Sequence, residues 1–101
     1  MKPKTAQFSL AALLTLSTGI KLSTPSFNEM HGMMEVMAGD AIGTVGLVLF
    51  ADTFAPILMK QHPFLKEIDR NLFLNKSDVE IQANLDRLIA QYGNSFTVQR
   101  A

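Results

Sequence analysis

Apolar residues recur at a helical period in several segments of the chain, and residues that cap or stop helices bound those segments. The first segment predicts a helix from Leu10 to about Ser17, because Ser9 can cap its first amides and Gly19 suits a left-handed stop. The alternative is the apolar part of a signal peptide behind Lys2 and Lys4. No small-x-small cleavage motif follows, so we favour the helix.

The second predicted helix carries a stripe of methionines. Ser26 and Glu29 form a capping box at its start, and Gly39 ends it. The residues at i, i+3, i+4 and i+7 are Met30, Met33, Met34 and Met37. A stripe of this kind is typical of an adaptable packing face, in the core or against a partner. Thioethers also bind Cu(I), so the alternative is a soft-metal site made of Met30, His31, Met33, Met34 and Met37.

The most apolar part of the chain is residues 41–59, which we interpret as a buried central helix. Its length also suits a membrane span, but Asp52 lies in the middle, and a charge there is unfavourable in a bilayer. Pro63 is expected to end this helix and to open a short one. The sequence therefore favours a core helix and no membrane association.

The last helix is the clearest one, with Ser77 and Glu80 as a capping box and Gly93 as its stop. Its apolar face consists of Ile81, Leu85, Leu88, Ile89 and Tyr92. Residues 96–98 alternate like a short strand, for which we expect Lys21–Leu22 as the partner.

Together these segments predict a mainly α fold with a minor β part. We expect one domain over residues 1–101, with residues 1–7 as a flexible N-terminal tail. It should contain about four helices and at most a short two-stranded sheet.

Composition limits the chemistry that the chain can perform. Nine basic and nine acidic residues give no net charge, which argues against nucleic-acid binding. The chain has no cysteine, and therefore no disulfide, thiolate nucleophile or zinc-finger spacing. His31 and Glu35 are expected to form a surface pair, and His62 to lie at a helix end. Because no serine stands in a nucleophile motif, we predict no enzyme activity, no cofactor and no metal.

Several short motifs carry a family resemblance over Phe8 to Val98. They are Phe8-Ser9-Leu10, Leu14-Thr15-Leu16-Ser17-Thr18-Gly19, Met34-Glu35-Val36-Met37-Ala38-Gly39-Asp40, Pro56-Ile57-Leu58-Met59-Lys60-Gln61-His62-Pro63-Phe64-Leu65 and Leu88-Ile89-Ala90-Gln91-Tyr92-Gly93. With these motifs the chain resembles a family of small tailed-phage and prophage proteins of unknown function. One departure is the apolar stretch Val45–Leu49, where that family looks polar.

The resemblance implies a phage or prophage accessory protein in the cytoplasm of a bacterial host. Since catalytic parts are missing, we predict that it binds another protein of host or phage, as a host-takeover or anti-defence inhibitor, or forms a homodimer. The residues expected to contact the partner are Met33, Met37, Val45, Leu47, Val48 and Phe50. The alternative function is an exported copper-binding protein that uses the methionine stripe.

Overall fold

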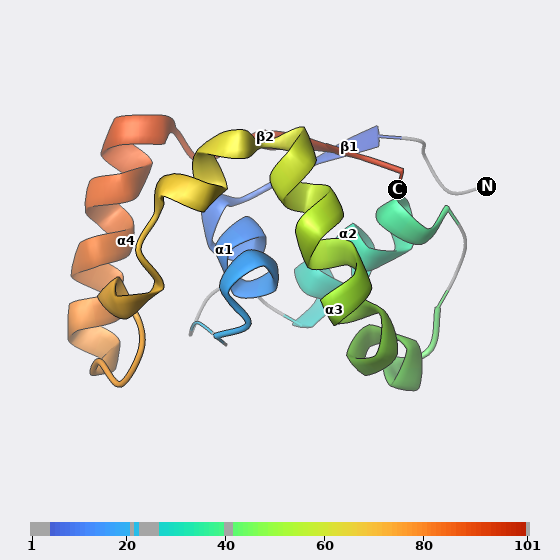
Figure 1. The fold of residues 1–101 in the computed structure, drawn as a ribbon, viewed down its shortest axis with the longest axis horizontal. Coiled ribbons are helices and arrows are strands. Elements are labelled where there is room, and N and C mark those ends of the chain that lie inside the picture. The colour runs from blue at the N-terminus through green and yellow to red at the C-terminus, as the bar shows by residue number, and fades with distance from the viewer. Residues whose placement is uncertain (1–4, 21, 23–26, 40–41, 101) are drawn as a thin grey trace.

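The computed structural model describes residues 5–20, 22, 27–39 and 42–100, and the side chains of residues 27 and 44–48 lie outside this description. The elements are β1 (Thr5–Phe8), α1 (Leu10–Thr18), α2 (Phe27–Ala38), α3 (Thr44–Gln61), the 3₁₀ helices η1 (Pro63–Glu67) and η2 (Arg70–Leu72), α4 (Asp78–Tyr92) and β2 (Phe96–Gln99). This confirms the predicted mainly α fold with a short two-stranded sheet (Figure 1). Within the described ranges, no helix has the length and apolar character needed to cross a bilayer.

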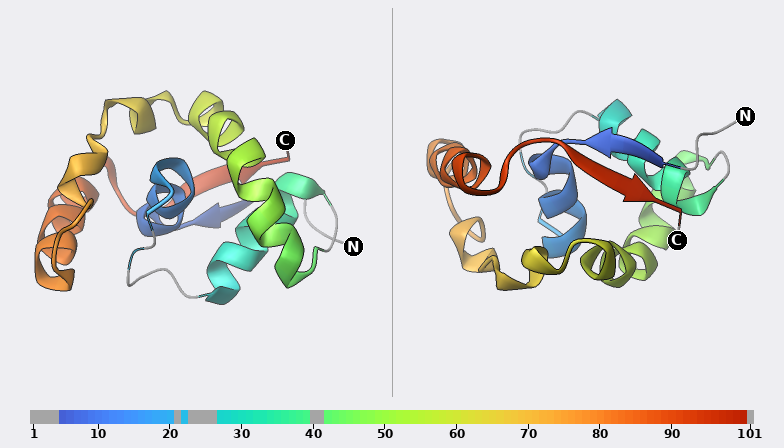
Figure 2. Two further views of the ribbon diagram at one scale, coloured as in Figure 1. Left: turned by 60° about the horizontal axis from the view of Figure 1, so that its bottom comes forward. Right: turned by 90° about the horizontal axis from the view of Figure 1, so that it is seen from above.

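The sheet joins the two ends of the described chain, since β1 pairs antiparallel with β2 (Figure 2). Phe8 lies opposite Phe96 in this register. The predicted strand at residues 96–98 is therefore confirmed, but its predicted partner at residues 21–22 is wrong. Residues 5–7 form a strand where a flexible tail was expected, because their side chains alternate between exposed and half-buried positions over the core.

The central helix of the fold is α1, which lies between α3 and α4 in Figure 1. Its first five residues, 10–14, are only 0–3% exposed. Thr15 and Thr18 tolerate this position because their hydroxyls donate to the carbonyls of Ala11 and Leu14 at 2.8 and 2.6 Å. Ser9 caps the helix and Gly19 ends it with φ 73°, as predicted.

The expectation that residues 41–59 form the buried central helix is wrong. In α3, Phe54 and Leu58 are buried at 7% and 0% exposure, whereas Leu49 is 67% and Phe50 41% exposed. The shorter α1, with six of its nine residues buried, fills the centre, so α3 covers it from one side only. This leaves an apolar surface on α3.

The last helix, α4, lies at one end of the molecule (Figure 1). Ser77 caps it by accepting from the Glu80 amide at 3.2 Å, and the Ser77 hydroxyl donates to the Glu80 carboxylate at 3.3 Å. Ile81 and Leu85 are buried, at 7% and 2% exposure, on the face predicted from the sequence. The cap expected from Ser26 for the second helix lies outside the described residues.

Candidate functional site

The methionine stripe packs into the core. Met33, Met34 and Met37 are 0%, 2% and 1% exposed, and only Met30 is half-buried. Met33 and Met37 are therefore not accessible to a partner in this structure, which corrects their assignment as partner-binding residues. The physical reason is that α2 turns this face toward the buried α1 and the sheet.

His31 and Glu35 both hydrogen-bond to the backbone of Ile42, which lies just before α3. The Nε2 atom of His31 donates to the carbonyl of Ile42 at 2.6 Å, and Glu35 Oε2 accepts from the Ile42 amide at 3.1 Å. The other oxygen of Glu35 lies 3.8 Å from His31 Nδ1. Of the expected surface pair, Glu35 is buried at 8% exposure and His31 is half-buried, and both hydrogen-bond to the backbone of Ile42.

This arrangement bears on the soft-metal alternative. The thioethers of Met33, Met34 and Met37 are packed in the core. The imidazole of His31 is hydrogen-bonded to a backbone carbonyl. Among the described residues, no group of three or more His, Cys, Asp or Glu could hold a metal ion. The donors of the alternative site therefore serve packing and hydrogen bonding in this structure.

His62 also has a structural position. Its Nε2 atom lies 2.7 Å from the carbonyl of Thr97. The ring packs edge-on against Phe64 and Phe96, with centroids 6.1 and 5.7 Å away. Both histidines thus contact backbone carbonyls, and His62 joins α3 to β2.

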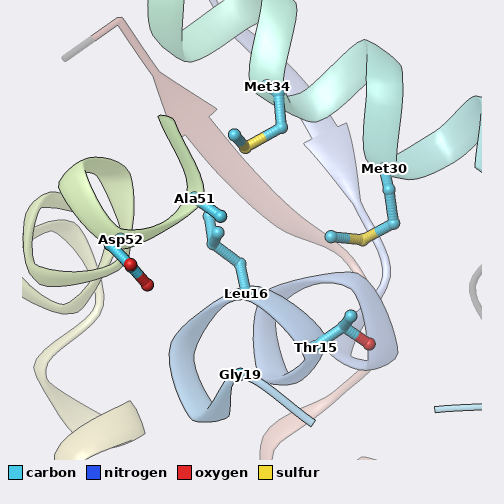
Figure 3. Close-up of a pocket in the computed structure, with 7 residues that line it drawn as sticks. All are labelled: Thr15, Leu16, Gly19, Met30, Met34, Ala51 and Asp52. Atoms are coloured by element: carbon cyan, nitrogen blue, oxygen red, sulfur yellow. The ribbon is translucent and has the colours of Figure 1, made fainter. Parts of the chain in front are cut away.

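An apolar cavity of about 230 Å³ opens between α1, α2 and α3. It is lined by Thr15, Leu16, Gly19, Met30, Met34, Ala51 and Asp52 (Figure 3). In Figure 3, the Met30 side chain extends from α2 toward α1, and the Met34 side chain extends toward Ala51 on α3. Sequence reasoning singled out the two methionines, but not the cavity, because its lining comes from three helices that are far apart in the chain.

Two exposed apolar side chains of α3 lie just before its cavity-lining residues in sequence. Leu49 and Phe50 directly precede Ala51 and Asp52, which line it. The ring of Phe50 stacks on that of the buried Phe54, with centroids 5.5 Å apart and an angle of 17°. We call Leu49, Phe50 and the cavity lined by Ala51 and Asp52 the α3 surface. Phe50, which was predicted to contact a partner, is exposed here, whereas the side chains of Val45, Leu47 and Val48 lie outside the description.

A second hollow, of about 420 Å³, lies between η2 and α4. Its charged lining residues are Asp69, Lys76, Glu80 and Arg87. Because these charges have both signs, the hollow favours no ligand charge. Its Asn84 amide donates to the Leu72 carbonyl at 2.8 Å, which ties α4 to η2.

The chain was also compared with known proteins. Residues 8–68, from the end of β1 to just past η1, match the family described as "Domain of unknown function (DUF7736)". No curated protein and no solved structure matches the chain.

Proposed function

The chain belongs to the DUF7736 family, and on that premise we propose that it acts without catalysis, by binding another protein through the α3 surface. The observations that carry the proposal are the exposure of Leu49 and Phe50, 67% and 41%, and an apolar cavity lined by the next two residues of α3. Apolar side chains grouped around a hollow are characteristic of binding surfaces, whereas single exposed ones are ordinary.

The chemistry of the α3 surface fits a partner that presents one large apolar side chain. Burial of a leucine or phenylalanine side chain contributes about 1.5–3 kcal/mol, so a few such residues dominate an interface. The cavity would receive the partner's anchor residue, and the flexible thioether of the half-buried Met30 could adjust to its shape. Leu49 and Phe50 would add apolar contact area on the exposed part of the same helix.

The resemblance to phage and prophage proteins supports a partner inside an infected or lysogenic bacterium. We place the protein in the host cytoplasm, where a defence, replication or regulatory factor is the expected target. This part of the proposal rests on family analogy rather than on the geometry of the surface.

Affinity capture from the lysogenic or infected host, followed by quantitative mass spectrometry, tests the proposal. The test variant carries Leu49→Asp and Phe50→Asp together. The matched control is Val79→Asp on α4, because Val79 is 80% exposed and lies far from the cavity lining in sequence. A partner retained by wild type and control but lost from the α3 variant supports the proposal. Equal capture by all three proteins would overturn it.

A further inference from the structure

The outer edge of β2 is covered by two side chains from the end of α3. The Gln61 amide donates to the Gln99 carbonyl at 3.0 Å, and its oxygen accepts from the Gln99 amide at 2.9 Å. His62 Nε2 donates to the carbonyl of Thr97 at 2.7 Å. Side chains thus take the place of a third strand beside β2 and satisfy backbone groups there.

These contacts fix which residues face the free edge of β1. In an antiparallel pair, hydrogen-bonded and non-hydrogen-bonded positions alternate. Thr97 and Gln99 direct their backbone groups away from β1, so their opposite residues, Gln7 and Thr5, occupy non-hydrogen-bonded positions as well. Thr5 and Gln7 therefore point their amides and carbonyls toward the other edge of β1. In the part of the chain that is described, no group outside the sheet bonds to these backbone atoms.

We propose that this free edge of β1 pairs with β1 of a second copy of the chain. An antiparallel pairing centred on Ala6 places Thr5 of one copy opposite Gln7 of the other, with amide and carbonyl groups matched on both sides. Ala6 then faces Ala6 of the other copy at a non-hydrogen-bonded position, where opposing backbones come closest. The small alanine side chain suits that approach.

Such an assembly closes at two copies. Each end of the combined sheet is a β2 edge that Gln61 and His62 already cover, so no further strand can add. Pro3 precedes β1 and has no amide hydrogen, which limits the paired stretch. The zero net charge adds no long-range repulsion between copies.

The pairing is independent of the proposed function. In Figure 1 the sheet crosses the top of the molecule, whereas α3 begins at the bottom. A dimer joined through β1 would therefore leave the α3 surface open, and either proposal can fail without the other.

Cysteine cross-linking of the full chain tests the pairing, because the natural sequence has no cysteine. Under mild oxidation, Ala6→Cys should give about tenfold more covalent dimer than Thr5→Cys or Gln7→Cys alone, since only position 6 faces itself. A mixture of the Thr5→Cys and Gln7→Cys proteins should form a cross-linked dimer of one protein with the other. Because both positions are exposed, we expect these substitutions to preserve the fold.

Non-reducing gels and light scattering provide the readout. Selective dimer formation by Ala6→Cys, together with the mixed Thr5→Cys and Gln7→Cys dimer, supports the symmetric pairing. Cross-linking of Ala6→Cys no stronger than that of either neighbour, with no mixed dimer, would overturn it.

Discussion

The carboxylate of Glu29 accepts two hydrogen bonds from Ser9, one from its amide at 2.8 Å and one from its hydroxyl at 3.1 Å. The amide of Leu10 donates to the side chain of Asn94 at 3.0 Å, and Ser9 itself accepts from Ala12. The first amides of the buried helix α1 are thus satisfied by three separate parts of the chain. The negative charge of Glu29 also lies at the end of the helix where the dipole favours it.

This relationship predicts that Ser9 and Glu29 stabilise the fold as a pair. Ser9→Ala should lower the free energy of unfolding by about 1 kcal/mol, as for a lost helix cap. Glu29→Ala should lower it by about 1–3 kcal/mol, because two half-buried donors of Ser9 lose a charged acceptor. Denaturant unfolding of both single variants and the double variant should show a coupling of about 0.5–3 kcal/mol. Strictly additive effects would contradict the pairing.

On α4, Leu85 should be essential for folding. Leu85→Asp places a charge where the side chain is 2% exposed, so we expect loss of cooperative thermal melting by circular dichroism. The control is Ala83→Asp on the exposed side of the same helix, with a helix-propensity loss of about 0.7 kcal/mol. A Leu85→Asp protein that melts like the control would show that α4 does not pack through this residue.

The methionine stripe should behave as core. Met33→Ala should cost about 2–5 kcal/mol of stability, whereas Met33→Leu, which keeps the volume, should cost less than about 1.5 kcal/mol. Replacement of the four stripe methionines by leucine gives the test against the copper alternative. Stoichiometric Cu(I) uptake by the wild-type protein that this variant lacks would contradict a packing role.

At the β2 edge, Gln61→Ala should speed hydrogen exchange at the Gln99 amide, since that amide donates to the Gln61 side chain. The Val98 amide serves as the internal control, because it belongs to the alternate set that faces β1. Nuclear magnetic resonance can follow both amides in one sample. Equal acceleration at both positions would indicate general loosening of β2 instead of a covered edge.

Local signals in the sequence were sufficient for most of the helices. Caps and stops such as Ser9, Gly19, Ser77 and Gly93 act within a few residues, so their roles could be predicted. The buried face of α4 could also be predicted, since the polar and apolar sides of this helix are distinct.

Features that depend on distant parts of the chain could not be predicted. The strand β1 is four residues long and is stabilised by pairing with β2 at the other end of the sequence. Both α1 and residues 41–59 are strongly apolar, and composition does not decide which helix is enclosed by the others. The local signal at Glu29 predicts a cap for its own helix and carries no sign of its contact with Ser9, the cap of α1.

The central claim is that another protein binds at the α3 surface, and photo-cross-linking in the native host tests it most directly. A photoreactive amino acid would replace Phe50 in one protein and Val79, exposed on α4, in the control. After irradiation, we expect one discrete heavier product from position 50, with the attached protein identified by mass spectrometry, and none from position 79. Products of the same size and yield from both positions, or none from position 50, would contradict the account.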